Sequence, residues 1–281
     1  MLLLFILACT GEVLDSGVDT GRAVDSGPQD SDTEQEESGH AGDSDSGVPA
    51  LTLRLGIPNQ TEPGSEVWEG FVTGAEATGG FVVLNPDSGP GSVLDADWLA
   101  AVEAARARGV RVLGYVPTTL GTRDAESVDG DVNQYTTWYD VDGIWFDEVP
   151  ADCGSLAPWY AERARAADAL VSGGDAFVVL NPGKISCEDY LEAADVLVVA
   201  YDRLPQITDF VAPTWMAGHG RERFMFVAYD APGSDLGQTL KFVHDAGIGW
   251  TVVTDDRPRD PFDALPTYWE SEVAAVTEFV E

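Results

Sequence analysis

Short apolar runs alternate with amphipathic stretches from about residue 51 to the end of the chain. The runs have the length of buried strands, and the stretches between most of them carry apolar residues at helical spacing. Strands are expected over Leu51–Ile57, Phe81–Leu84, Val110–Val116, Gly143–Phe146, Ala176–Leu180, Val196–Tyr201, Phe224–Tyr229 and Gly249–Val253. Helices are expected over Ala96–Arg108, Ser127–Tyr139, Ser155–Val171, Leu236–Ala246 and Tyr268–Val280. This alternation predicts an α/β protein with a single (β/α)8 TIM-type barrel.

A doubly wound sheet is the alternative fold. No glycine-rich phosphate loop follows the first run, which argues against a nucleotide-binding sheet of that kind. A barrel makes a further prediction, because its active site lies where the strands end. Polar side chains follow the predicted strands at those ends: Asn85, Tyr115, Thr118, Asp147, Glu148, Asn181, Asp202, Asp230, Asp255 and Asp256. Helix N-caps account for a few of these Asp and Asn residues. They do not account for a Tyr, a Thr and paired carboxylates on one rim.

Asp147 and Glu148 come directly after the apolar run Gly143–Phe146. Neighbours on a regular strand point to opposite faces, so both reach a cleft only if the backbone turns at the strand end. Glycoside hydrolysis uses two carboxyl groups, about 5–5.5 Å apart for retention or about 6.5–9.5 Å for inversion. The plainer interpretation is an Asp that caps the next helix beside an exposed Glu. In a shared cleft, like charges are expected to raise the pKa of at least one carboxyl.

Five segments resemble a known family. They are GYVPTTLGTR (114–123), DVNQYTTWY (131–139), VDGIWFDEVP (141–150), NPDSGPG (85–91) and TDDRPRDPFDALPTYW (254–269). In this order they are similar to the spherulin 4 (spherulation-specific family 4) proteins, which include glycoside hydrolase family 135. The resemblance covers roughly residues 51–281. It implies a glycoside hydrolase acting on α-1,4-linked galactosamine or N-acetylgalactosamine polysaccharide. A non-catalytic carbohydrate-binding or envelope structural protein on a degenerate barrel is the alternative.

The resemblance also implies catalytic roles for Asp147, Glu148 and a third carboxylate after the sixth strand. The family usually has Glu there, whereas this chain has Asp202, which is one methylene shorter. If Asp202 does not reach, Asp230 or Asp255 is the replacement. We expect Asp147, Glu148 and Asp202 to share one cleft, and expect substrate contacts from Asn85, Tyr115, Thr118, Arg123, Asn181, Tyr201 and Asp255. Arg123 is expected to pair with a cleft carboxylate, with a surface arginine as the alternative.

The first fifty residues differ from the rest in composition. Residues 1–9 are an apolar run ending in Ile6-Leu7-Ala8-Cys9, the pattern of a lipoprotein signal in which Cys9 is lipidated. Residues 10–48 are rich in Asp, Ser and Gly, and predict a disordered acidic linker before a catalytic domain over residues 49–281. We therefore expect an exported protein that is lipid-anchored at the cell envelope or surface, or released outside the cell. A lipid anchor is the expected membrane contact.

Cysteine and histidine usage leads to further expectations. Besides Cys9 the chain has Cys153 and Cys187, which follow neighbouring predicted strands. In an exported protein this pair suggests a disulfide. The three histidines, His40, His219 and His244, show no metal-ligand spacing. We expect no metal and no cofactor.

The acidic balance affects the choice of partner. The whole chain has a net charge of −34. Residues 1–50 contribute −10 of it, through eleven acidic residues and Arg22, which leaves −24 for the rest. Such a domain repels nucleic acid, so none is expected as a partner. It attracts a cationic polymer such as partly deacetylated galactosaminoglycan. Adaptation to high salt explains the acidity equally well. We expect a monomer.

Overall fold

The computed structural model describes residues 52–152, 154–257 and 261–280. The described chain forms a closed barrel of eight parallel strands in sequential order, with β8 pairing back to β1. This closure confirms the TIM-type barrel and excludes the open doubly wound sheet. The strands are β1 (Arg54–Ile57), β2 (Phe81–Leu84), β3 (Arg111–Pro117), β4 (Gly143–Asp147), β5 (Phe177–Leu180), β6 (Val196–Arg203), β7 (Phe224–Tyr229) and β8 (Trp250–Val253).

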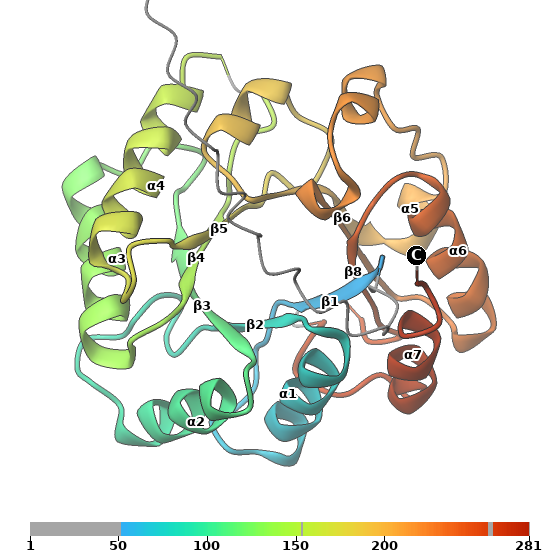
Figure 1. Cartoon of the computed structure of the whole chain (residues 1–281), viewed down its shortest axis with the longest axis horizontal. Helices are drawn as coiled ribbons and strands as arrows, with labels where there is room; N and C mark the ends of the chain where they lie inside the picture. Colours follow the sequence, from blue (N-terminus) through green and yellow to red (C-terminus); the bar gives the residue numbers. More distant parts are fainter. Residues whose placement is uncertain (1–51, 153, 258–260, 281) are drawn as a thin grey trace, which may run out of the picture. The chain divides into compact units, whose positions relative to one another are not determined.

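Helices surround the strands in Figure 1. They are α1 (Glu66–Thr78), α2 (Ala96–Ala107), α3 (Ala125–Tyr139), α4 (Ala157–Leu170), α5 (Leu204–Ile207), α6 (Leu236–Asp245) and α7 (Trp269–Val276). Side-chain caps fix the starts of three of them, through Ser65, Asp95 and Asp124. Between β5 and β6 the connection holds only a 3-10 turn, Glu188–Glu192. No helix in the described part of the chain is both long and apolar enough to cross a membrane.

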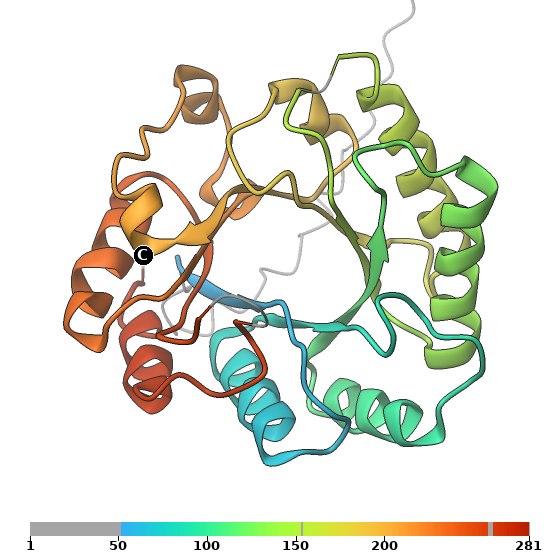
Figure 2. The same ribbon diagram turned by 180° about the vertical axis from the view of Figure 1, so that it is seen from behind.

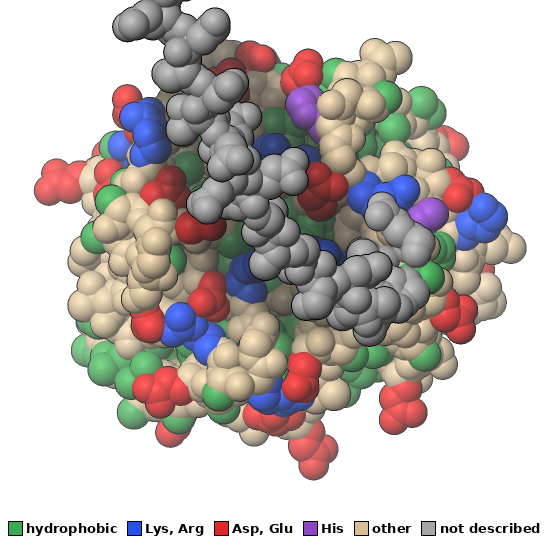
Figure 3. All heavy atoms as spheres, in the orientation of Figure 1, with side chains coloured by type: hydrophobic (Ala, Val, Ile, Leu, Met, Phe, Trp, Pro, Cys, Tyr) green, Lys and Arg blue, Asp and Glu red, His purple; other side chains and the backbone are tan. Residues whose placement is uncertain are grey.

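Aromatic side chains fill the barrel near the amino ends of its strands. Phe81 packs against Trp145, Phe177 and Trp250, with ring centroids 5.2 to 6.3 Å apart. The guanidinium groups of two arginines lie over this cluster: Arg54 is 5.5 Å from the Trp250 ring and Arg111 is 4.3 Å from the Phe177 ring. In the space-filling view of this face, hydrophobic side chains lie at the centre with charged ones around them (Figure 3). The amino end of the barrel is therefore closed by packing.

The opposite face, seen in Figure 2, carries the carboxyl ends of the strands. Strand alternation brings every second residue towards the barrel axis. In β6 this alternation is interrupted, because the register with β7 shifts between Val198 and Ala200. Val198 pairs with Met225, but Ala200 pairs with Phe226, whose ring packs outside the barrel against Phe210 and Phe242. The irregularity therefore exchanges the two faces of β6 beyond Val199.

Candidate active site

Asp147 and Glu148 both line one cavity of about 510 Å³ at the carboxyl ends of the strands. Asp147 ends β4 and shares the inward phase of Trp145, two residues earlier. Glu148 follows with a φ of +54°, a left-handed conformation that non-glycine residues rarely adopt. This turn puts two consecutive carboxylates on the same side of the chain, which a continuing strand does not allow. The interpretation of Asp147 as a helix cap is wrong, because α4 starts at Ala157 without a side-chain cap.

The Asp147 carboxylate is held at both oxygens by neutral donors from the two neighbouring strands. The Tyr115 hydroxyl, on β3, donates to Oδ2 at 2.7 Å. The Asn181 amide, directly after β5, donates to Oδ1 at 2.6 Å. Burial, followed by the charge of Asp147, raises the pKa of Tyr115 above its ordinary value, so this phenol keeps its proton and donates. Both bonds suit an ionised Asp147, which accepts at each oxygen.

Glu148 is exposed and sits nearer the solvent than Asp147. Its Oε2 accepts a hydrogen bond from the backbone N–H of Thr119 at 3.0 Å, and its carbonyl accepts one from Leu120 N–H at 2.8 Å. Thr119 and Leu120 also have positive φ values, of 49° and 55°. Three non-glycine residues in this conformation therefore meet at the cavity. Such backbone strain concentrates at functional sites.

Tyr201 reaches the same cavity from β6. Its inward position follows from the register shift, since Tyr201 pairs with Val227 beyond the irregularity. Burial, then the negative charge of Asp147, then Tyr229 raise the pKa of the Tyr201 phenol. The phenol therefore remains a neutral donor close to Asp147. Asn181, Tyr201 and the two carboxylates give the cavity both donors and acceptors, and its other lining residues are Thr119, Leu120, Val149, Pro182 and Gly183.

Asp202 does not line this cavity, contrary to the expected shared cleft. The same register shift that turns Tyr201 inward pairs Asp202 with Ala228, which puts Asp202 out of the inward phase that Tyr201 takes. Its Oδ1 accepts hydrogen bonds from its neighbour Arg203 N–H at 2.7 Å and from the Tyr229 hydroxyl at 3.1 Å. The sequence pattern could not show that Tyr201 points inward instead of Asp202. On a regular strand, every second residue shares a face, so Asp202 and not Tyr201 would lie on the face of Val198.

Thr118 and Arg123 have different surroundings from those expected. Thr118 is fully buried and its hydroxyl donates to the carbonyls of Asp147 and Glu148, so it lies behind the cavity wall. Arg123 pairs with Asp131 at 2.8 Å and donates to the Pro117 carbonyl at 2.7 Å. It holds the loop after β3 against α3, and the expected pairing with a cleft carboxylate is wrong.

Asn85, Asp230 and Asp255 also lie outside the cavity lining. Asn85 accepts a hydrogen bond from Gly89 N–H at 3.0 Å and closes its own loop. Asp230 pairs with the exposed Arg257 at 3.4 Å. Asp255 accepts hydrogen bonds from the N–H and hydroxyl of Thr267, which fix the segment before α7. Each of these polar strand ends therefore stabilises a loop.

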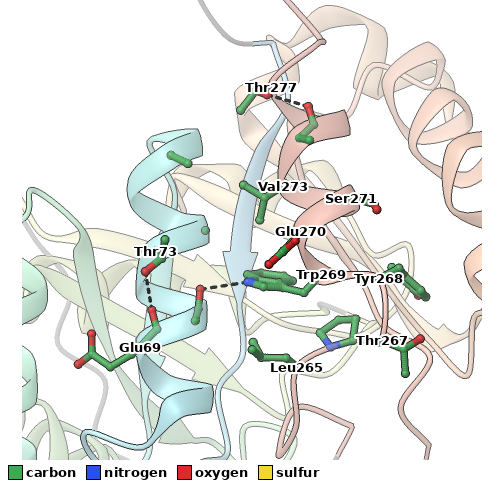
Figure 4. A pocket seen from close by; sticks show the side chains of 15 residues that line it. Glu69, Thr73, Leu265, Thr267, Tyr268, Trp269, Glu270, Ser271, Val273 and Thr277 are labelled. Carbon is green, nitrogen blue, oxygen red and sulfur yellow. Dashed lines mark hydrogen bonds between the residues drawn. The ribbon is translucent and has the colours of Figure 1, made fainter.

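A larger cavity, of about 870 Å³, lies outside the barrel between α1 and α7 (Figure 4). The Trp269 ring lies across it, with Nε1 donating to the Gly70 carbonyl at 3.1 Å. Glu69, on its α1 side, pairs with Arg108 at 3.3 Å. This cavity is a mainly apolar groove without the paired carboxylates of the barrel mouth. Among the described residues, no group of three or more His, Cys, Asp or Glu could hold a metal ion.

The expected disulfide falls partly outside the described residues. Cys187 is disulfide-bonded. Cys153 and Cys9 are not among the residues that the structure describes. The signal segment and the acidic linker also lie outside them.

Comparison with known proteins identifies the family. The model of spherulation-specific family 4 (Spherulin4) matches residues 56–276, which is most of the chain. The protein belongs to this family. A curated relative is Spherulin-4 of Physarum polycephalum, 26% identical over 242 residues that cover 80% of this chain and 70% of that protein. The family match confirms the resemblance that the five segments indicate.

Two solved structures share the barrel. The Aspergillus clavatus Sph3 structure, determined in complex with GalNAc, has a TM-score of 0.71 at 23% identity, and the match covers 80% of this chain and 98% of that one. The Bacillus cereus spore cortex-lytic enzyme SleL has a TM-score of 0.50 at 9% identity, over 82% of this chain and 75% of that one. At these identities the likenesses show the fold.

Proposed function

We propose that this spherulin 4 family protein is a glycoside hydrolase that cleaves α-1,4-linked galactosamine or N-acetylgalactosamine polysaccharide. The observation that carries the proposal is the placement of two carboxylates, Asp147 and Glu148, on one open cavity at the barrel mouth. Glycosidases need such a pair on either side of the scissile bond. The GalNAc bound to Sph3 supports the sugar class for a member of the same family.

The hydrogen bonds suggest different roles for the two groups. Both oxygens of Asp147 accept hydrogen bonds, from Tyr115 and from Asn181. Asp147 suits the residue that stays ionised and stabilises positive charge at the sugar, as nucleophile or electrostatic partner. Glu148 has one bond, to Thr119 N–H, and lies at the solvent side. It suits the group that gives a proton to the leaving oxygen and takes one back.

The first experiment measures new reducing ends from purified galactosaminogalactan with the full chain, Asp147→Asn and Glu148→Gln. Both variants are expected to lose at least about 100-fold in rate, as removal of a general acid–base group does. A substrate with a good leaving group, such as a dinitrophenyl α-galactosaminide, separates the roles. Glu148→Gln should recover much of its rate on it because little proton donation is needed, whereas Asp147→Asn should not. Rates like those of the unsubstituted protein in both variants overturn the proposal.

Substrate charge is a finer part of the proposal. The net charge of −24 on residues 51–281 favours a partly deacetylated, cationic polymer as substrate. Raising the ionic strength should then lower kcat/KM on that polymer and leave it nearly unchanged on a fully N-acetylated one, because salt screens steering between charges. Equal salt responses on both polymers contradict cationic steering and favour salt adaptation as the source of the acidity.

The second candidate function is carbohydrate binding without hydrolysis. The position of Asp202 favours it, because the resemblance implies a third catalytic carboxylate after the sixth strand and Asp202 does not line the cavity. This function predicts saturable glycan binding with no new reducing ends after long incubation. Asp202→Glu discriminates further, since gained activity indicates an eroded enzyme.

We also propose export with lipidation at Cys9, which a Cys9→Ala variant tests by loss of the protein from the membrane fraction.

A further inference from the structure

A buried hydroxyl pair lies behind the two carboxylates. The Thr118 Oγ1 is 2.8 Å from the Asp147 carbonyl oxygen and 3.1 Å from the Glu148 carbonyl oxygen. It is also 2.7 Å from the Tyr160 hydroxyl, which comes from α4. Thr118 has no exposed surface, and neither does Tyr160. This cluster joins the end of β3, the end of β4 and the helix that follows β4.

The protons in this cluster are determined by its geometry. A threonine hydroxyl has one proton, and the two carbonyl oxygens can only accept, so they share it. Tyr160 must then donate to Thr118 Oγ1. Burial raises the pKa of Tyr160 to about 12, with the bond to Thr118 acting in the opposite direction, so the phenol retains the proton that it donates. The order of donation is Tyr160 to Thr118 to the carbonyls of Asp147 and Glu148.

These two carbonyls flank the left-handed turn at Glu148. The Asp147 carbonyl also accepts from Thr118 N–H at 2.9 Å, and the Glu148 carbonyl accepts from Leu120 N–H at 2.8 Å. A non-glycine residue leaves a φ of +54° for extended backbone unless its surroundings hold it. Extended backbone at Glu148 sends its side chain to the face opposite Asp147. Loss of this clamp therefore separates the two carboxylates without removing either.

We propose that Thr118, with Tyr160 behind it, is a positioning residue that fixes the turn at Glu148 and so keeps both carboxylates on one cavity. The kinetic part of this inference rests on the proposed hydrolysis, and its structural part does not. Thr118 touches no substrate, since it is buried behind the cavity wall. Its effect passes through the peptide groups of residues 147 and 148.

The test uses the full chain with Thr118→Val, Thr118→Ser and Tyr160→Phe. Valine keeps the shape and loses the hydroxyl, and serine restores the hydroxyl. Thr251→Val is the matched control, because Thr251 is equally buried and its hydroxyl donates to a strand carbonyl, that of Phe226, at 2.9 Å. Thermal unfolding measures the general cost of removing a buried hydroxyl in each variant.

Thr118→Val is expected to lower kcat roughly 100-fold with little change in KM, the size of effect that a misplacement of about 1 Å produces. Thr118→Ser should restore most of the rate. Tyr160→Phe should give a smaller loss of kcat, because Thr118 keeps its own proton for the carbonyls. Thr251→Val should lower the Tm, as loss of a buried hydroxyl does, and leave kcat unchanged. Equal kcat in Thr118→Val and Thr251→Val overturns the inference.

A second readout does not depend on hydrolysis. Crystal structures of the full chain and of Thr118→Val, or the Cα and Cβ chemical shifts of Glu148 in labelled protein, report its backbone conformation. The left-handed turn should be lost in Thr118→Val and kept in Thr118→Ser. If the unsubstituted protein releases no reducing ends, the proposed function fails while this measurement still decides the inference. A Glu148 turn that persists without the Thr118 hydroxyl overturns it.

Discussion

Asn181 donates its side-chain amide to Asp147 Oδ1 at 2.6 Å, the shorter of the two hydrogen bonds that hold this carboxylate. The two residues are 34 positions apart, yet each follows the last buried residue of its strand, Phe146 and Leu180, which pair in the register of β4 and β5. Asn181 N–H and the Phe146 carbonyl continue this ladder at 2.9 Å. The Asn181 Oδ1 accepts from Gly183 N–H at 3.0 Å, which fixes the amide with its NH2 group towards Asp147.

Asn181→Ala is therefore expected to lower kcat about 10- to 100-fold, because a hydrogen bond to a charged group contributes roughly 1.5–3 kcal/mol. Steady-state kinetics on galactosaminogalactan measure the loss. Asn85→Ala is the matched control: Asn85 also follows a strand, but its side chain accepts from Gly89 N–H and does not contact Asp147. If kcat falls by the same factor in Asn181→Ala and Asn85→Ala, the role of Asn181 is contradicted.

Tyr115→Phe removes the second donor to Asp147 and keeps the ring. Without the hydroxyl at 2.7 Å, Oδ2 loses its fixed partner and the carboxylate can rotate. We expect a roughly tenfold fall in kcat, consistent with about 1.5 kcal/mol for one charged hydrogen bond. Combining Tyr115→Phe with Asn181→Ala should cost a different amount from the sum of the single effects, since both act on one group. Strict additivity argues against a joint clamp on Asp147.

The barrel and the paired carboxylates could be predicted from the chain because they depend on local pattern. Apolar runs of strand length mark all eight strands, and Asp147-Glu148 stands out against the apolar residues before it. The register shift at Val198 to Ala200 has no such mark in its apolar run, so the sequence predicts Asp202 in the shared cavity, which it does not line. Tyr160 was missed for another reason. It lies on a helix, and its contact with Thr118 spans 42 residues.

Asp202→Asn is expected to keep kcat within about threefold of the unsubstituted protein, since Asp202 does not line the cavity and an isosteric change outside it should alter the activation free energy by no more than about 0.5 kcal/mol. The variant keeps an oxygen that can accept from the Tyr229 hydroxyl and Arg203 N–H. Hydrolysis assays beside Asp147→Asn make the comparison. A loss of kcat as large as that of Asp147→Asn would mean that Asp202 acts at the reacting centre. It would contradict the placement of Asp202 outside the cavity.

Glu272, on α7, supplies a prediction about stability and pH. Its side chain has no exposed surface, and Oε1 accepts a hydrogen bond from Val253 N–H at 2.7 Å. No hydrogen bond to Oε2 is found among the described residues. Burial raises the pKa of Glu272 to about 8, opposed by the bond from Val253 and assisted by the charge of Asp255. The folded protein therefore keeps a proton on Glu272 that the unfolded chain releases near its ordinary pKa of 4.5.

The sign follows from proton binding. Between about pH 4.5 and 8 the unfolded state binds fewer protons than the folded state at this group, so stability falls as pH rises through this window. Glu272→Gln keeps an acceptor for Val253 N–H and cannot ionise. Its Tm should match that of the unsubstituted protein near pH 5 and exceed it at pH 8, by an amount corresponding to a few kcal/mol.

Thermal unfolding of the full chain at half-unit steps from about pH 5 to 8.5 measures this effect. The matched control is Glu270→Gln, which removes an exposed carboxylate two residues earlier on the same helix. Its Tm should run parallel to that of the unsubstituted protein, because an exposed group titrates similarly in both states. The Glu272→Gln curve should diverge upward as pH rises. If it also runs parallel, Glu272 does not hold a proton in the fold, and the buried carboxyl is not the source of the pH dependence.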